Sequence, residues 1–362
     1  MKEETVRGAV ENLPPYIPGK QVEEVAREFG LKKVFKLASN ENPLGTSPLA
    51  FEALAAEIKH SYIYPDQHHI SLKEALSKKY GLPKEYFIAG NGSDEIMLMA
   101  AQTFLSAGDE AIISRHTFSM YEFVTRIMDG KPVFVELKDH RYDLEGFQKA
   151  LTARTKLVFL CNPNNPTGTI FTKTELEAFI KSVPEDVILV VDEAYGEYSD
   201  SPEYPSGIDL VSSGRNIIVL RTFSKIYGLA GMRVGYGIAK PEIIKYLSMT
   251  KMPFNVGRAA QAAAAAALSD DKFVGESIKN NKEGKIFLYS ELDKLKVKYQ
   301  PTQANFICID LGREADAVFT ELLRQGVIIR PLSSFGLRDS IRVTIGTKEQ
   351  NEAFINALKK GL

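Results

Sequence analysis

The 362-residue sequence predicts an α/β fold: a mainly parallel seven-stranded sheet sandwiched by helices, joined to a smaller α+β domain. Between about residues 86 and 240, helical patterns separate short apolar runs, which read "YFIAG", "EAIIS", "PVFVEL", "KLVFLC", "VILVVD", "NIIVL" and "RVGYGIA". The runs are rich in Val and Ile and hardly alternate between apolar and polar residues, which is typical of strands buried on both faces. Helices should therefore cover both sides of this sheet.

Helix-start signals and a change of pattern define the remaining elements. "SDEIMLMAAQTFL" begins with Ser-Asp and "TKTELEAFIKSV" with Thr, both favoured at helix starts. The last hundred residues predict an Ala-rich helix from about Arg258, a charged helix near "KNNKEGKIFLYSELDKL", the strands "NFICIDL", "VIIRPL" and "SIRVTIG", and the helices "EADAVFTELLRQG" and "KEQNEAFINALKK". A helix "QVEEVAREFG" is expected to pack on this part. We therefore expect a large domain over 45–252 and a small one formed by 1–44 and 253–362.

Composition excludes several classes of partner. Formal net charge is −1, so neither nucleic acid nor an anionic membrane is expected to bind. The N-terminus has no apolar core of a signal peptide, and the longest apolar tracts are too short to span a bilayer, which predicts a cytoplasmic protein. The two cysteines, Cys161 and Cys308, are far apart and predict reduced thiols rather than a disulfide or zinc site. The five histidines have no metal-ligand spacing, so no metal is expected.

The segment "RTFSKIYGLAGMRVGYG" follows an apolar run and carries groups suited to an anion. Thr222, Ser224 and Arg233 can all bind phosphate oxygens. Gly228 and Gly231 would allow the backbone to come close to such a ligand.

Lys225 lies among these groups. A lone lysine after a strand is usually a solvated surface charge. A neighbouring cation such as Arg233 would lower its pKa and make the amine a nucleophile. A nucleophilic lysine beside a phosphate site predicts a Schiff base with pyridoxal 5'-phosphate. Nucleotide binding fits less well, because the segment lacks the third glycine of the dinucleotide fingerprint and the chain has no phosphate-binding loop ending in Gly-Lys-Ser or Gly-Lys-Thr.

Three further motifs follow predicted strands. In "VILVVDEAY", Asp192 either caps the next turn or pairs with a pyridine nitrogen, and Tyr195 can reach the cofactor's phenolic oxygen. "CNPNNPTG" is a rigid turn whose asparagines can also donate to a cofactor oxygen. "AGNGSDE" is a common turn and cap, but it can also bind an anion at a helix start.

With these four motifs in this order and spacing, the chain resembles the fold-type I, class II pyridoxal-phosphate aminotransferases over nearly its whole length. "LPPYIPG", "KLASNENPLG", "GVIIRPL" and "SIRVTIGT" resemble the histidinol-phosphate aminotransferase branch of that family.

The resemblance implies a role for each candidate residue. Lys225 would hold the cofactor, Asp192 would pair with the pyridinium, and Phe118 would stack on the ring. The other cofactor contacts would be Tyr195 and Asn165 at the phenolic oxygen, Gly92, Ser93, Thr222, Ser224 and Arg233 at the phosphate, and Tyr64 from the neighbouring subunit of a homodimer. Substrate would be bound by Arg342 at an α-carboxylate, with Tyr16, Asn42 and Arg330 as further candidates.

The implied reaction is amino transfer from histidinol phosphate to 2-oxoglutarate, giving imidazole acetol phosphate and glutamate in histidine biosynthesis. An aromatic amino-acid aminotransferase would use the same catalytic set. A threonine-phosphate decarboxylase shares much of the pattern. A regulator that binds pyridoxal phosphate without turnover is a third alternative.

Overall fold

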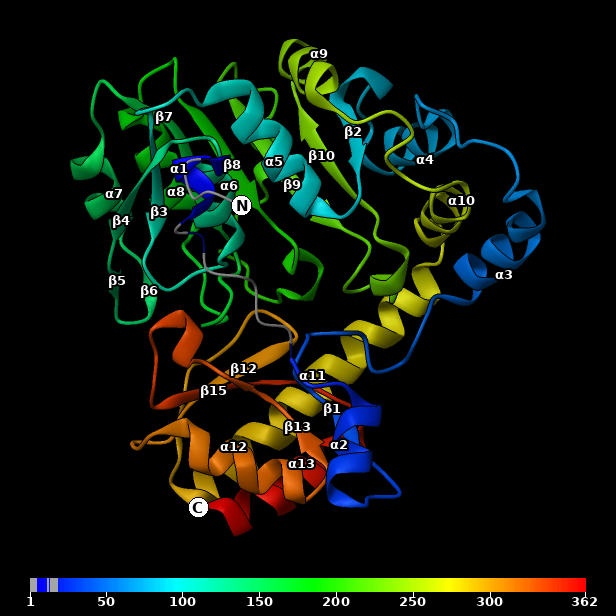
Figure 1. Cartoon of the computed structure of the whole chain (residues 1–362), viewed down its shortest axis with the longest axis vertical. Coiled ribbons are helices and arrows are strands. Elements are labelled where there is room, and N and C mark those ends of the chain that lie inside the picture. The colour runs from blue at the N-terminus through cyan, green and yellow to red at the C-terminus, as the bar shows by residue number, and fades with distance from the viewer. Residues whose placement is uncertain (1–4, 12, 14–18) are drawn as a thin grey trace.

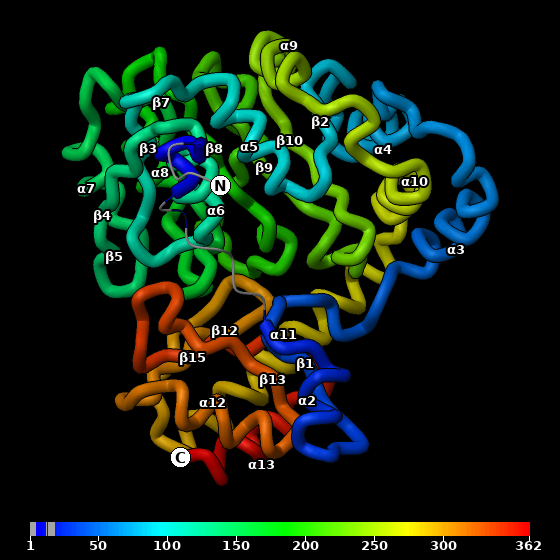
Figure 2. The backbone as a smooth tube through the Cα atoms, viewed as in Figure 1, coloured from blue at the N-terminus to red at the C-terminus, as the bar shows by residue number. Residues whose placement is uncertain are grey.

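The structure, a computed structural model, describes residues 5–11, 13 and 19–362. Figure 1 shows a large part with a twisted central sheet and a smaller part below it, which contains the C-terminus. Figure 2 shows that a single long helix, α11 (Asp271–Leu295), runs from the large part into the small one.

The large sheet has seven strands within the described residues, and they are the seven that the sequence predicts. In spatial order they are β2 (Phe87–Gly90), β10 (Gly235–Ala239), β9 (Ile217–Thr222), β8 (Ile188–Asp192), β7 (Thr155–Cys161), β3 (Glu110–Ser114) and β4 (Lys131–Val135). Strand β10 runs antiparallel to both of its neighbours, and the other pairs are parallel. The predicted, mainly parallel α/β sheet is therefore confirmed.

Helices cover both faces of this sheet (Figure 1). The helices of the large part are α3 (Pro48–Glu57), α4 (Ile70–Tyr80), α5 (Ser93–Phe104), α6 (Met120–Ile127), α7 (Leu144–Ala150), α8 (Lys173–Ser182), α9 (Pro241–Thr250) and α10 (Arg258–Ala267). Of these, α3 packs on α10 rather than on the sheet (Figure 1). The threonine signal is confirmed for α8, because Thr172 accepts from the backbone of Glu175 while the Glu175 side chain accepts from that of Thr172. A two-stranded hairpin, β5 (Leu137–Lys138) with β6 (Arg141–Tyr142), lies beside the sheet's last strand.

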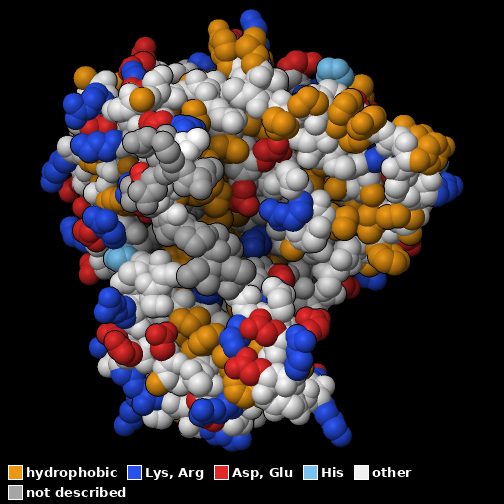
Figure 3. Space-filling view, viewed as in Figure 1, with side chains coloured by type: hydrophobic (Ala, Val, Ile, Leu, Met, Phe, Trp, Pro, Cys, Tyr) orange, Lys and Arg blue, Asp and Glu red, His pale blue; other side chains and the backbone are white. Residues whose placement is uncertain are grey.

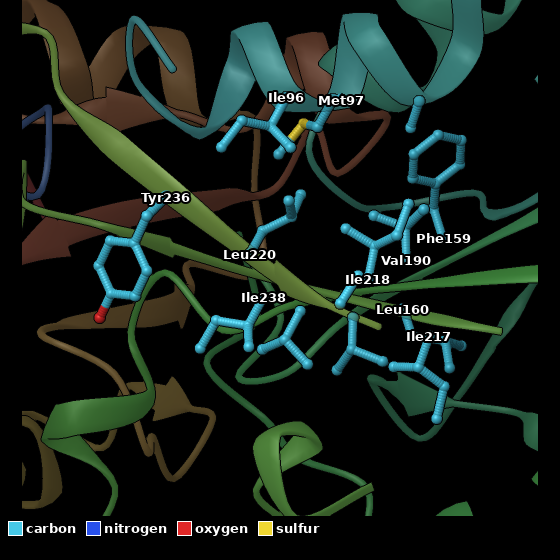
Figure 4. Packing of buried hydrophobic residues seen from close by; sticks show 14 of the residues in the cluster. Ile96, Met97, Phe159, Leu160, Val190, Ile217, Ile218, Leu220, Tyr236 and Ile238 are labelled. Atoms are coloured by element: carbon cyan, nitrogen blue, oxygen red, sulfur yellow. The ribbon is translucent and has the colours of Figure 1, made fainter. Parts of the chain in front are cut away.

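The core lies between the sheet and its helices. Figure 4 shows Ile96 and Met97 of α5 above the strand side chains Leu220 and Ile218, with Tyr236 at one end. All five side chains are buried, with at most 2% of their surface exposed. Burying such side chains stabilises the fold by about 1.5–3 kcal/mol each. This explains why the apolar runs do not alternate: both faces of each strand are covered.

The small part is an α+β unit, as predicted. Its four-stranded antiparallel sheet has the order β11 (Lys298–Tyr299), β12 (Phe306–Asp310), β15 (Ser340–Thr344) and β14 (Arg330–Pro331). A parallel pair joins β1 (Phe35–Lys36) to β13 (Val327–Ile328). The helices of this part are α2 (Val22–Phe29), α12 (Ala315–Arg324), α13 (Lys348–Gly361) and the second half of α11.

The run "VIIRPL" does not form the single strand expected. Its first two residues pair with β1, and Arg330–Pro331 pair with β15 in the other sheet. Strand β14 is an edge strand, which is where a proline without an N–H is tolerated.

Packing bears on the expected domain boundaries. Helix α10 packs against α3 and α4, and its buried alanines belong to the large core. Near the N-terminus, α1 (Gly8–Glu11) packs on α6, and Arg7 forms an ion pair with Asp129. We therefore propose that the second boundary lies near Asp270 rather than at 252/253, and that only the part of the N-terminal segment around α2 belongs to the small unit.

Among the described residues, no helix combines the length and apolar character needed to cross a membrane.

Candidate active site

A cavity of about 870 Å³ lies between the carboxyl edge of the large sheet and the small sheet. It brings together residues that are up to 332 positions apart in the chain (342 − 10 = 332). The candidates that line it are Gly92, Ser93, Phe118, Asn165, Asp192, Tyr195, Thr222, Ser224, Lys225, Arg233, Arg330 and Arg342.

Strand direction explains why these groups meet. Asp192 is the last residue of β8 and Thr222 the last of β9, and parallel strands end at the same edge. Strand β10 runs the other way, so its first residue, Gly235, pairs with Thr222 at that edge. Arg233, two residues earlier, is thereby placed beside the ends of its neighbours.

Lys225 faces the cavity and is partly exposed there. Its Nζ donates to the carbonyl of Ser39 at 3.2 Å and lies 5.5 Å from the centre of the Tyr195 ring. Burial lowers the pKa of Lys225 to about 8, and the Arg342 guanidinium lowers it further than Arg233 does. The sequence argument had assigned this effect to Arg233 alone. With a pKa near 8, about a tenth of the amine is neutral at pH 7.

Asp192 is 3% exposed and both of its oxygens accept hydrogen bonds. Its Oδ1 accepts from the backbone of Ala194 at 3.0 Å, and its Oδ2 accepts from the hydroxyl of Tyr121 at 2.6 Å. Burial raises the pKa of Asp192 to about 6, although both hydrogen bonds oppose this rise. The carboxylate therefore caps the next turn and also lines the cavity, and its pairing with a ring nitrogen stays a prediction.

A candidate anion site lies at the start of α5. The sequence signal placed the helix cap at Ser93, but the cap is Gly92, and Ser93 is the first helical residue. Gly92 has φ +75°, and a Cβ there would lie 2.7 Å from Nη2 of Arg233. The first N–H groups of the helix have no partner within it. Arg233 also reaches Ser224 Oγ at 3.5 Å and Asp94 at 3.3 Å.

Gly228 has a different use from the one expected. It has φ +67°, and a Cβ there would lie 1.8 Å from the carbonyl oxygen of Gly45. Its close approach is therefore to the segment that links the two parts, not to the anion site. Nothing lies within 4 Å of a Cβ at Gly231.

Two arginines of the small sheet line the cavity. Arg330 and Arg342 are directly opposite each other across β14 and β15. Arg342 is 6% exposed, donates to Asn165 Oδ1 and donates to the Ala38 carbonyl at 2.7 Å. Arg330 is partly buried and donates to Ser334 Oγ at 3.5 Å. Like charges directly opposite on a sheet are destabilising, so this pair favours an anionic ligand.

A nucleophilic amine, a buried carboxylate and an anion site together fit pyridoxal phosphate, which carries an aldehyde, a ring nitrogen and a phosphate. Residues 32–358 match the family described as "Aminotransferase class I and II". The chain belongs to this family. It is therefore an aminotransferase that depends on pyridoxal 5'-phosphate.

Curated relatives of this aminotransferase match it along almost the whole chain. The histidinol-phosphate aminotransferase of Moorella thermoacetica is 51% identical over 98% of this chain and 92% of its own length. Histidinol-phosphate aminotransferase 2 of Carboxydothermus hydrogenoformans is 48% identical, with 98% of each chain covered.

Solved structures agree with the fold. The histidinol-phosphate aminotransferase of Sinorhizobium meliloti, in complex with pyridoxal-5'-phosphate, has a TM-score of 0.90 at 27% identity, with 98% of this chain and 97% of that one covered. The enzyme from Clostridium acetobutylicum has a TM-score of 0.84 at 25% identity, covering 90% and 98%.

Two described candidates of the aminotransferase, Tyr64 and Asn42, do not line the cavity described above. Tyr64 is 77% exposed, and its ring stacks on Phe254 at 4.7 Å between centres. The buried amide of Asn42 donates to the Ile226 carbonyl and to Ser277 Oγ, both at 2.8 Å. Asn42 therefore supports the loop after Lys225 instead of reaching the cavity. Tyr16 lies outside the described residues.

Sequence reasoning missed two residues that contact the candidate set. Tyr121 donates to Asp192, and Asn40 donates to the Tyr195 hydroxyl at 3.0 Å. Tyr121 lies in the first turn of α6, and Phe118 precedes that helix, so helical spacing does not relate the two rings, which meet edge-on at 5.8 Å. Asn40 has φ +56°, and nothing in the local pattern indicates its partner.

Proposed function

We propose that this aminotransferase transfers the amino group of histidinol phosphate to 2-oxoglutarate, as the names of its relatives indicate. The observation that carries the proposal is the pair Arg330 and Arg342, directly opposite each other in one cavity with Lys225. A phosphate has a charge of about −1.5 to −2 near neutral pH and three acceptor oxygens, which suits two guanidinium groups.

When bound, pyridoxal phosphate supplies an aldehyde that accepts the amino group and a ring that accepts electrons. Lys225 would hold the aldehyde, and its Nζ, once freed by the substrate amine, would take and return the proton of the amine-bearing carbon. Positioned proton transfer of this kind contributes about 10²–10⁴-fold to the rate. A pKa near 8 suits the lysine to this work, since the neutral amine is accessible near neutral pH.

The remaining groups would hold and orient the cofactor. Asp192 would pair with the ring nitrogen as a carboxylate, and Phe118 would stack on the ring. Asn165 and Tyr195 would bind the phenolic oxygen. The start of α5 and the side chains of Thr222, Ser224 and Arg233 would bind the phosphate.

Arg342 binds the α-carboxylate of glutamate in the second half-reaction, and histidinol phosphate has no such group. Arg330 then binds the distal phosphate of the donor, with Tyr16 as its proposed partner. Each arginine therefore has a proposed anionic partner, and histidinol phosphate and 2-oxoglutarate both place anionic groups against the small sheet.

We also propose a homodimer in the cytoplasm, with shared active sites. Figure 3 shows hydrophobic side chains gathered on the upper right of the molecule, over α3, α9 and the adjoining loops. The exposed apolar residues of this region are Leu49, Phe51, Ile58, Tyr62, Ile63, Tyr64, Met249, Met252 and Phe254. A contiguous apolar patch of this kind is typical of an interface. Tyr64 lies within it, where it can reach the phosphate site of a second copy.

The first prediction concerns the donor. We expect histidinol phosphate to be the best of three donors, assayed side by side with phenylalanine and threonine phosphate, because only it combines a distal phosphate with no α-carboxylate. Formation of glutamate is the measurement. Faster turnover of phenylalanine would establish the aromatic aminotransferase instead, and carbon dioxide release from threonine phosphate without amino transfer would establish the decarboxylase.

The second prediction concerns the shared site. Tyr64→Phe and Lys225→Ala subunits, each of low activity, should regain part of the activity when mixed, because a hybrid dimer contains one site with both native residues. Subunit exchange is followed with differently tagged chains. Exchange without any recovery would contradict a tyrosine contributed across the interface.

A further inference from the structure

Tyr121 is buried between the two groups that hold the cofactor ring. It belongs to α6, its side chain has no exposed surface, and it is not one of the residues lining the cavity. Its ring stacks on Phe159 at 4.9 Å with an interplanar angle of 13°, and meets Phe118 edge-on at 5.8 Å. Its hydroxyl donates to Asp192 Oδ2 at 2.6 Å. One side chain therefore contacts both the proposed stacking ring and the proposed partner of the ring nitrogen.

The hydroxyl acts on an unusual carboxylate. Asp192 is buried at the end of β8, where burial penalises its charged form. The other acidic groups near it, Glu193 and Asp94, penalise that form as well. Against this stand two donors, the backbone of Ala194 on Oδ1 and Tyr121 on Oδ2. Tyr121 supplies the side-chain donor of the two, so it is the one that a substitution can remove.

We propose that Tyr121 is a positioning residue for catalysis: its hydroxyl keeps Asp192 anionic and aimed at the ring nitrogen, so that the nitrogen stays protonated. The proposal rests on the role of Asp192 proposed above. A carboxylate that loses a donor becomes more basic and retains the shared proton itself. The ring nitrogen would then be neutral, and the ring would accept electrons less well.

The test compares two ligands of the apoenzyme. One is pyridoxal phosphate. The other is its benzene analogue, in which C–H replaces the ring nitrogen and which gains nothing from an anionic Asp192. In Tyr121→Phe, the affinity for pyridoxal phosphate divided by the affinity for the analogue should fall about tenfold. This is the size expected for losing a hydrogen bond to a charged group. The substitution keeps the ring and its stacking on Phe159, and a thermal melt of the apoenzyme checks folding.

Two further variants make the result decisive. Tyr236→Phe is the matched control, because Tyr236 is also fully buried and its hydroxyl bonds only to that of Tyr80 at 2.6 Å among the hydrogen bonds described. Its affinity ratio should equal that of the native enzyme. Asp192→Asn should itself abolish the preference for pyridoxal phosphate, and adding Tyr121→Phe to it should change nothing more.

The outcomes separate the two proposals. Equal weakening of both ligands by Tyr121→Phe, or an unchanged ratio beside a strong effect of Asp192→Asn, would overturn the role of Tyr121 and leave that of Asp192 intact. An unchanged ratio in Asp192→Asn would overturn both.

Discussion

Lys225→Ala is expected to lower the rate of amino transfer by about 10⁴-fold, the upper end for a residue that transfers a proton in place. The same change removes the amine that anchors the aldehyde of the cofactor. The purified native protein should be yellow, and borohydride should remove the visible absorbance and fix the label on Lys225. The variant should bind pyridoxal phosphate without a label that survives this treatment.

Lys73→Met is the matched control for this prediction. Burial lowers the pKa of Lys73 too, but Lys73 lies on α4 and does not line the cavity. The Lys73→Met variant should retain activity and should still be labelled by borohydride on Lys225. A borohydride label on Lys73, Lys251 or any other lysine would refute the assignment.

The second large effect is expected at the distal phosphate. Histidinol, which lacks the phosphate, should show a kcat/KM about 10⁴-fold below that of histidinol phosphate, because a site built for a charged group strongly rejects an analogue that lacks the group. Arg330→Ala should reduce this difference in kcat/KM, because it should lower the kcat/KM for histidinol phosphate and leave that for histidinol unchanged. Steady-state rates for both donors in both enzymes measure the effect.

Arg338→Ala is the control for charge. Arg338 is exposed in the loop between β14 and β15 and is not a lining residue of the cavity, so removing its charge should leave the difference in kcat/KM unchanged. An equal loss for both donors in Arg330→Ala would instead mean that Arg330 supports its own strand.

The large fold was predictable because burial on both faces leaves a direct trace in the sequence. Each unalternating run of Val and Ile became one strand of the large sheet. An apolar run does not show where the chain leaves one sheet and pairs with another. "VIIRPL" therefore looked like one strand, although it serves two sheets. Likewise, the alanines of α10 are apolar enough for either core, and only packing against α3 assigns them to the large one.

The candidate site was predictable where its residues follow strands and less so where they depend on packing. Asp192 and Lys225 follow apolar runs, so a strand-end argument finds them. The contact of Tyr121 with Asp192 depends on how α6 lies on the sheet, 71 positions away (192 − 121 = 71). Asn42 and Gly228 were expected to serve ligands because their motifs look ligand-like, but both support the segment beside Lys225.

The cavity takes its proposed cofactor contacts from the large unit and its two proposed substrate-binding arginines from the small sheet. Lys225, Asp192 and the anion site belong to the large unit, whereas Arg330 and Arg342 are on adjoining strands of the small sheet. A change of residue on β14 or β15 can therefore alter which amine is accepted without touching the groups that carry out the chemistry. Such a division would let related enzymes diverge in substrate while inheriting one reaction, with new preferences arising by a few substitutions in the last fifth of the chain.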